Sequence, residues 1–274
     1  MQTDFVVLNY ERELSSLGLK DLTSVRKFEG TLVKNHRGHR DILKLEIPTD
    51  NEGATLVFFL KRNFKAYRKN GLNSLWRNRS VWSESRIEYQ NTRKLAEAGI
   101  HTAEVVAYGE DCGPLWERFS FILSRQAEGD QSLDEWAEGN PTQQEIRYIG
   151  KSLASLIRKM HSANLATPDL FARHIFIEKI KSEPRFTLID MARLDQLWLM
   201  SDRRRARDLA ALNLSIPLRY LSMSRRLEFL IAYTGSRQAA RRILIQIRKR
   251  VNRVKNRSKF QDYFESDKPG TGLR

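Results

Sequence analysis

The chain has 274 residues, of which 41% are hydrophobic and 30% charged, so it should fold as one large domain or two lobes and is not a disordered chain. Its 48 Lys and Arg against 33 Asp and Glu give a formal net charge of +15, which calls for a polyanionic partner or surface such as nucleic acid, anionic lipid or a phosphorylated glycan. Its apolar runs are far shorter than the roughly 18 residues of a membrane span, it shows no signal pattern, and its single Cys112 cannot form an internal disulfide, so we expect a cytoplasmic location.

The first part of the chain is predicted to be rich in strands. Alternating apolar residues and turn signals predict strands over residues 30–33, 42–47, 55–60, 104–108 and 119–124. A helix is predicted over residues 85–98, because Ser85 and Glu88 fit a capping box and Gly99 supplies a stop. Residues 61–83 hold seven Lys or Arg and no acid, which is too basic for a core element.

After residue 127 the pattern becomes helical. Asn140 as cap and Pro141 as first helical residue predict a long helix with apolar positions every three or four residues. Short strands are predicted over residues 174–177 and 186–190, and helices from Arg205 onward. We therefore expect an N-lobe over residues 1–127, a C-lobe over residues 128–260 and a flexible tail over residues 261–274.

A small set of charged residues stands where phosphoryl transfer from ATP would need it. That reaction requires a cation on the phosphates, acidic oxygens for Mg²⁺ and a group that orients the attacking hydroxyl. Lys61 ends a predicted strand, and Glu88 on the next helix either pairs with Lys61 or only caps its own helix. Asp169 lies in a loop before a short strand, His174 follows five positions later, and Asp190 ends the partner strand. A carboxylate at the end of an apolar strand is costly unless it is paired or bound to metal.

The order and spacing of these residues resemble the Kdo/WaaP lipopolysaccharide kinases, a bacterial branch of the kinase-like fold. The resemblance covers roughly residues 30–225, and its most specific segments are Phe59-Leu-Lys-Arg62, Glu88 to Gly99, Pro168-Asp-Leu-Phe-Ala-Arg-His-Ile-Phe-Ile177, Leu188-Ile-Asp-Met-Ala-Arg193 and Arg207-Asp-Leu-Ala-Ala-Leu212. It implies an α+β, bilobal protein-kinase-like fold with a strand-rich N-lobe and a helical C-lobe. It also implies ATP- and Mg²⁺-dependent phosphorylation of a Kdo or heptose hydroxyl in the lipopolysaccharide inner core, on the inner face of the inner membrane.

The resemblance also implies a role for each residue. Asp169 would be the catalytic base, His174 and Asp190 would lie at the metal site, and Lys61 with Glu88 would hold the ATP phosphates. Asp208 has the place of a helix-borne Asp that braces the catalytic loop. The backbone of Gln126 and Ala127 would bind adenine.

Two departures from the kinase pattern keep other functions open. Thr167-Pro168 replaces the His-Arg that usually precedes the catalytic Asp, and no G-x-G-x-x-G motif lies near the first strands, where only Gly30 and Gly38 are available. Because the Asp itself is present, activity is expected. The alternatives are a kinase of another small molecule or protein, and a basic, non-catalytic pseudokinase or RNA-binding scaffold.

Two basic segments could meet the expected polyanion. Residues 237–259 hold ten Lys or Arg and no acid, with apolar residues along one helical face. This helix could dock on the second lobe, lie on an anionic membrane or bind nucleic acid, although no nucleic-acid motif accompanies it. Residues 61–79, which include Trp76 and are followed by Trp82, are expected to meet the acceptor. The expected partners are the lipopolysaccharide glycolipid and an anionic inner-membrane surface, without nucleic acid.

Overall fold

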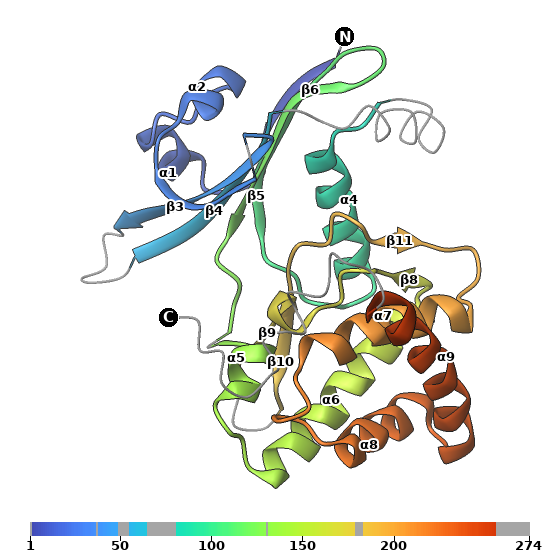
Figure 1. Ribbon diagram of the computed structural model, residues 1–274. Coiled ribbons are helices and arrows are strands. Elements are labelled where there is room, and N and C mark those ends of the chain that lie inside the picture. Colours follow the sequence, from blue (N-terminus) through green and yellow to red (C-terminus); the bar gives the residue numbers. More distant parts are fainter. Residues whose placement is uncertain are drawn as a thin grey trace. The chain divides into compact units, whose positions relative to one another are not determined.

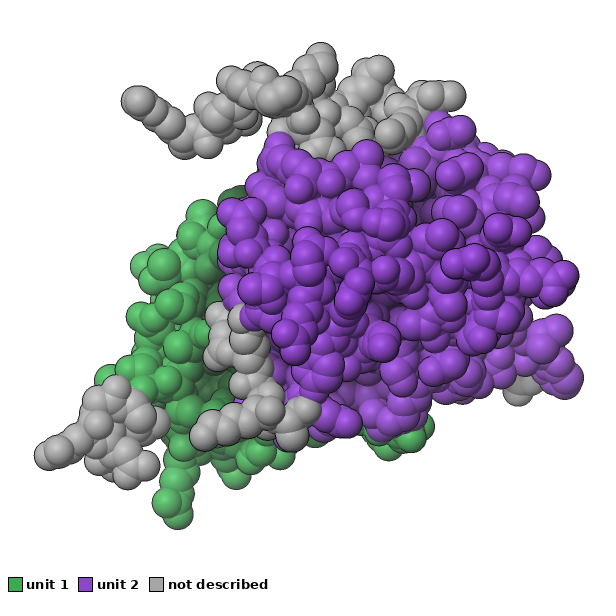
Figure 2. Space-filling model, turned by 90° about the horizontal axis from the view of Figure 1, so that it is seen from below, with its two compact units in different colours: residues 1–97, 102–127 green, residues 98–101, 128–274 purple. Residues whose placement is uncertain are grey.

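The computed structural model describes residues 2–36, 38–48, 55–64, 81–129, 131–178 and 183–255, which form two compact units (Figures 1 and 2). Unit 1 comprises residues 1–97 and 102–127, and unit 2 comprises residues 98–101 and 128–274. The division after residue 127 lies where the sequence pattern changes, but the short segment 98–101 belongs to unit 2. The expected tail, residues 261–274, and most of the basic segment 61–79 lie outside the described residues.

Unit 1 is built on a six-stranded antiparallel sheet in the order β1-β5-β6-β4-β3-β2. Its strands are β1 (Gln2–Val7), β2 (Thr31–His36), β3 (Arg40–Pro48), β4 (Thr55–Asn63), β5 (Val105–Cys112) and β6 (Glu117–Arg125). The helices α1 (Glu11–Ser16) and α2 (Leu22–Lys27) lie on one side of the sheet and α4 (Glu84–Glu97) on the other (Figure 1). The sequence predicts α4 and every strand except β1; it misses α1 and α2, which are too short to show helical periodicity.

The two faces of β4 explain how charged residues are buried in this sheet. Phe58 and Leu60 are fully buried in the core that α1 and α2 cover. Arg62 shares their face; its guanidinium pairs with Asp41 at 2.7 and 2.9 Å and donates to three carbonyls near the end of α2. The prediction that the segment from Lys61 is too basic for a core element is therefore wrong for its first residues, because a fully bonded guanidinium can be buried.

The N-terminus of α4 is fixed by buried polar groups. Ser83 Oγ accepts a hydrogen bond from Arg86 N at 3.0 Å, so Ser83 caps the helix and the predicted capping box at Ser85 is wrong. Ser83 N donates to Glu110 Oε2 at 3.0 Å, and Glu84 N donates to Glu117 Oε2 at 2.9 Å. Two carboxylates from the sheet thus satisfy free amides of the helix end, where the helix dipole favours negative charge.

Glu117 should make the stability of unit 1 depend on pH. Burial raises its pKa to about 7 from 4.5, against hydrogen bonds from Ser120 and Glu84 that lower it. Between these two values the folded protein holds a proton that the unfolded chain has released, so stability falls as pH rises through this range. Between pH 4.5 and 7.5, we expect the free energy of unfolding of wild type to fall by on the order of 3 kcal/mol more than that of Glu117→Gln, measured by urea denaturation.

The exposed Glu97 provides the matched control for this prediction. Glu97→Gln should leave the pH dependence of wild type unchanged, since its side chain is 69% exposed. Equal pH dependence in wild type and Glu117→Gln would contradict the assignment.

Unit 2 is mainly helical, with short strands around one loop cluster (Figure 1). Its helices are α5 (Leu133–Glu138), α6 (Gln143–Ser162), α7 (Asp202–Ser215), α8 (Met223–Thr234) and α9 (Arg237–Lys255). One small sheet has the order β10 (Arg185–Leu188), β9 (Ile175–Glu178), β7 (Gln131–Ser132), and another pairs β11 (Asp195–Gln196) with β8 (Leu165–Ala166). The 3-10 helix η1 spans Ala172–His174.

Several boundaries in unit 2 differ from the prediction. Helix α6 is capped by Thr142 and not by Asn140, because Thr142 Oγ1 accepts from Glu145 N and Glu145 Oε2 accepts from Thr142 N. His174 ends η1 and does not begin a strand, and β10 ends two residues before Asp190. Both differences place these side chains in turns next to the strands, where their direction is set by the loop.

The basic helix α9 is docked through its apolar side. Ala240, Ile243 and Ile247 are buried, and α9 packs on α7 and α8. This confirms the docked arrangement among the three that the sequence left open, and it means that α9 can offer an anionic surface its charges but not its apolar face. Within the described residues, no helix combines the length and the apolar character that a membrane span requires.

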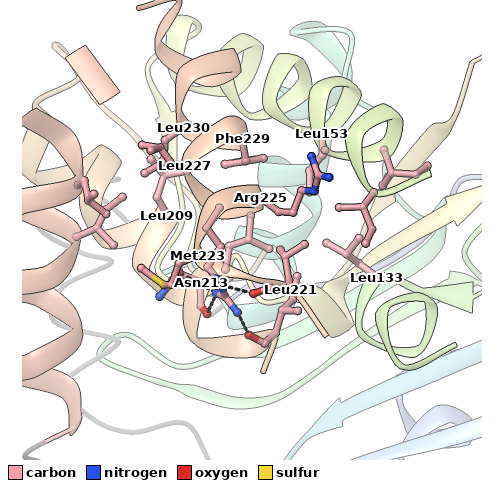
Figure 3. A pocket seen from close by; sticks show the side chains of 18 of the residues that line it. Leu133, Leu153, Leu209, Asn213, Leu221, Met223, Arg225, Leu227, Phe229 and Leu230 are labelled. Carbon is pink, nitrogen blue, oxygen red and sulfur yellow. Dashed lines mark hydrogen bonds between the residues drawn. The ribbon is translucent and has the colours of Figure 1, made fainter. Parts of the chain in front are cut away.

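An apolar cavity of about 100 Å³ lies among the helices of unit 2 (Figure 3). All five helices line it, with side chains such as Leu133, Leu153, Leu209 and Leu230. Trp136 also lines it, and its buried indole N–H has no hydrogen-bond partner among the described residues. The lining includes none of the charged residues that the sequence singled out.

Candidate active site

In unit 1, Lys61 and Glu88 form a nearly buried ion pair. Lys61 Nζ lies 2.8 and 3.0 Å from the two carboxylate oxygens of Glu88. Their side chains are only 12% and 11% exposed. Lys61 alternates with Leu60 along β4 and so points to the face that α4 covers, where Ser83 and its acidic partners fix the helix. Of the two interpretations of Glu88, the ion pair is the one found.

Gln126 and Ala127 follow β6 at the end of unit 1. The backbone N–H of Gln126 donates to Val57 O at 2.8 Å, which extends the pairing with β4. This N–H is therefore already used, and an adenine contact from this segment would have to come from the Gln126 carbonyl or the Ala127 backbone.

In unit 2, Asp169 sits in the loop between β8 and η1. Its backbone N–H donates to Thr167 Oγ1 at 3.2 Å, and its Oδ1 accepts from Arg193 Nη1 at 3.0 Å. The side chain is 18% exposed. Burial raises the pKa of this carboxyl, the Arg193 cation opposes that rise and the Asp190 charge adds to it. A half-buried carboxylate with a raised pKa is suited to accept a proton.

Asp208 braces this loop from α7, as predicted. Its carboxylate is fully buried, and its Oδ2 accepts from Thr167 N at 2.7 Å. Arg207 Nε donates to Oδ1 at 2.8 Å, and His161 Nε2 lies 3.3 Å from Oδ2. His161 Nδ1 in turn lies 2.7 Å from Tyr233 Oη. Tyr233, His161 and Asp208 thus form a buried chain of hydrogen bonds that ends on the residue two positions before Asp169.

His174 and Asp190 lie side by side. His174 Nε2 is 4.0 Å from Asp190 Oδ2. His174 Nδ1 lies 2.9 Å from the carbonyl of Asp169 and must carry the proton there, which leaves a lone pair on Nε2 that accepts from Arg173 Nε at 3.2 Å. Burial lowers the pKa of His174, so the neutral ring is favoured. Asp190 has a left-handed backbone, with φ of 55°, a conformation uncommon outside Gly and often found at functional sites.

The side chains of Asp190 and His174 suit Mg²⁺ that arrives with ATP. Among the described residues, no group of three or more His, Cys, Asp or Glu side chains could hold a metal by itself. Mg²⁺ usually binds through one or two carboxylates and completes its shell with phosphates and water. Asp190 offers the hard oxygen that it prefers, whereas the His174 imidazole is a softer ligand.

Three residues of the site received no role from the sequence: Arg193, His161 and Tyr233. Arg193 follows Asp190 by three positions, so the signal available in the sequence was a cation close to a predicted site acid. His161 follows Ile157 by four positions on the buried face of α6, where a polar residue requires a partner. Tyr233, on a separate helix, gave no comparable signal.

Comparisons with known proteins show the family to which the chain belongs. Residues 48–233 match the model of the lipopolysaccharide kinase (Kdo/WaaP) family. The chain is 30% identical over 157 residues to lipopolysaccharide core heptose(I) kinase WaaP of Pseudomonas aeruginosa, and 27% identical over 136 residues to the protein of the same name from Escherichia coli. These alignments cover 54% and 47% of this chain, and they span 59% and 51% of the two relatives.

The fold is similar to a solved structure of WaaP in complex with acyl carrier protein. The TM-score is 0.67 at 22% sequence identity, and the match covers 92% of this chain and 99% of that one. This likeness confirms the predicted α+β, kinase-like fold.

Proposed function

Because this chain belongs to the lipopolysaccharide kinase (Kdo/WaaP) family, we propose that it transfers the γ-phosphate of ATP to a sugar hydroxyl of the lipopolysaccharide inner core. The observation that carries the proposal is the Asp169 loop. It presents a carboxylate with a raised pKa, held by Arg193 and braced by Asp208. Such a carboxylate is what an acceptor hydroxyl needs.

Each residue of the site has its own role in the proposed reaction. Asp169 orients the acceptor hydroxyl and takes its proton as the new bond to the γ-phosphorus forms and the bond to ADP breaks. Lys61, oriented by Glu88, binds phosphate oxygens of ATP. Asp190, with His174 beside it, would hold Mg²⁺, which neutralises phosphate charge when bound. The Gln126 carbonyl and the Ala127 backbone are assigned to adenine.

Heptose is the acceptor that we favour over Kdo, since both curated relatives are named heptose(I) kinases. Labelled ATP should be incubated with two inner-core acceptors, one carrying unphosphorylated heptose and one ending at Kdo. Label should enter the heptose acceptor when Mg²⁺ is present and should not when the ion is chelated. Transfer only to Kdo would change the acceptor, and transfer only to a protein or small molecule would place the chain among other kinases.

The rival proposal, an RNA-binding scaffold without catalysis, would show as tight RNA binding without any transfer from ATP. An acceptor that is part of a glycolipid places the working protein at the inner face of the inner membrane. We propose peripheral attachment there, supported by the net charge of +15.

We also propose an acyl carrier protein as a partner. The similar solved structure is of WaaP in complex with acyl carrier protein. The apolar cavity of unit 2 supports the same partner here, because its lining is mostly Leu and Ile side chains, which suits an acyl chain better than a sugar or a nucleotide (Figure 3).

Gly150 gives a direct test of the cavity. It lines the cavity, and a Cβ added there would meet no atom within 4 Å. Gly150→Phe has room for its Cβ and should place its ring in the cavity, which should reduce capture of acylated carrier protein at least tenfold, measured by affinity purification and mass spectrometry of the bound acyl group.

Gly150→Ala is the matched control. It should retain acyl capture and stabilise α6 by about 0.5–1 kcal/mol, since Ala replaces Gly inside a helix. Undiminished capture by Gly150→Phe would place the acyl chain elsewhere.

A further inference from the structure

The loop between β11 and α7 presents two adjacent large apolar side chains to solvent. Trp198 is 99% exposed and Leu199 is 77% exposed, the two highest values among the large apolar side chains that the structure describes. A single exposed apolar residue is ordinary, but two together at a loop end mark an interaction site. We refer to Trp198 and Leu199 as the apolar tip.

The apolar tip is held in place from both sides. Leu197 N donates to Asn164 O at 2.9 Å, and Met200 N donates to Asn164 Oδ1 at 3.0 Å. Met200 itself is buried, and β11 pairs with β8 just before the tip. Asn164, two residues after α6, thus anchors both neighbours of the tip, so hydrogen bonds on both sides hold the exposed pair in place.

Basic residues surround the apolar tip. Residues 193–207 contain five Arg and two Asp. Three of these, Arg203 to Arg205, stand in the first turn of α7, at the end of a helix where the dipole disfavours positive charge. Arg204 pairs with Asp195 at 3.2 Å and Arg205 donates to Tyr233 Oη at 3.4 Å, whereas Arg203 is exposed. The segment as a whole keeps a surplus of positive charge, which an anionic partner outside the chain would complement.

We propose that the apolar tip enters the interface of an anionic phospholipid bilayer, with the Trp198 indole at the headgroups, Leu199 among the first acyl carbons and the exposed Arg203 of α7 on lipid phosphate. Trp favours this boundary because one end of it is apolar and the other polar. The proposal rests on the proposed function only in that a lipid-borne acceptor brings the protein to a membrane. It goes further by naming the loop that makes contact.

A second exposed pair provides an internal comparison. Leu115 and Trp116, in the turn between β5 and β6, are 49% and 43% exposed. Next to this turn, Asp111 and Arg118 pair with each other and Glu117 is buried, so the turn has no surplus of positive charge. The same two residue types without a basic surround should not bind an anionic bilayer.

The test compares co-sedimentation with vesicles of equal parts phosphatidylglycerol and phosphatidylcholine. Trp198→Ser/Leu199→Ser should lower the partition coefficient roughly 30-fold, and Leu115→Ser/Trp116→Ser should leave it near wild type. Trp198→Phe should retain binding, and it should lose the part of the tryptophan fluorescence that brominated lipids quench. Vesicles of phosphatidylcholine alone should bind weakly, since the arginines contribute through charge.

Three outcomes would overturn the inference: equal partitioning of wild type and the Trp198→Ser/Leu199→Ser variant, equal quenching of wild type and Trp198→Phe, or loss of acyl carrier protein capture in the double variant with vesicle binding intact. The last would make the tip a protein-binding site. Kinase activity is measured separately with an acceptor freed of its lipid. On that acceptor the Trp198→Ser/Leu199→Ser variant should match wild type. If wild type itself fails there, the proposed function falls and the vesicle result still stands.

Discussion

Asp169→Asn should reduce phosphoryl transfer by about a thousandfold and leave the fold intact. Asparagine keeps the shape of the side chain and an oxygen that can accept from Arg193, but it cannot take a proton from the acceptor. The half-buried carboxylate already bears a desolvation cost, seen in its raised pKa, so replacing its charge should change the free energy of unfolding little. The measurements are kcat with the heptose acceptor and urea denaturation.

Asp195→Asn is the matched control for this change. Asp195 also lies in unit 2, is also 18% exposed and also contacts arginine, at 3.2 Å from Arg204 and 3.8 Å from Arg207. Its removal should leave kcat within a few-fold of wild type. A turnover near wild type in Asp169→Asn would remove Asp169 from the chemistry, and equal losses in both variants would show only a general effect of removing acids from this unit.

Much of unit 1 could be predicted because alternation along a strand is a direct consequence of its geometry. The pattern of β3 and β4 predicted both strands, with Lys61 at the end of the second. The burial of Arg62 could not be predicted, since its partners Asp41 and the carbonyls of α2 come together only in the folded sheet. For the same reason Ser85 looked like a cap, although its hydroxyl bonds to Ser120 Oγ at 2.8 Å on a neighbouring strand.

The charged residues of the site were predictable to a different degree. Spacing singled out Asp169, His174 and Asp190, and all three lie beside the paired strands β9 and β10, with His174 at the end of η1 and the two acids in loops. The chain of hydrogen bonds behind Asp169 was only partly visible: Asp208 was predicted, whereas His161 and Tyr233 lie on other helices and meet it through tertiary packing. A buried polar network of this kind has little local signature, since each member is explained only by the others.

Asp208→Ala should destabilise the protein by about 3–5 kcal/mol, the largest stability effect that we expect from a single change. The substitution removes the acceptor of Thr167 N–H and leaves Arg207 and His161 without the carboxylate that both contact. All of this occurs at a position with no solvent exposure, so water cannot replace the lost partner easily. Urea denaturation followed by circular dichroism would measure the loss.

Asp208→Asn separates the structural role of this residue from its effect on the reaction. The amide oxygen can still accept from Thr167 N, so most of the stability should return, while the charge that faces Arg207 is lost. If the brace positions Asp169, this variant should lower kcat under conditions where it is fully folded, and KM for ATP should stay close to wild type, because Lys61, which we propose binds ATP, lies in the other unit. Loss of stability without any change in kcat in Asp208→Asn would leave Asp208 a purely structural residue and would put the positioning of the Asp169 loop down to Thr167 and Arg193 alone.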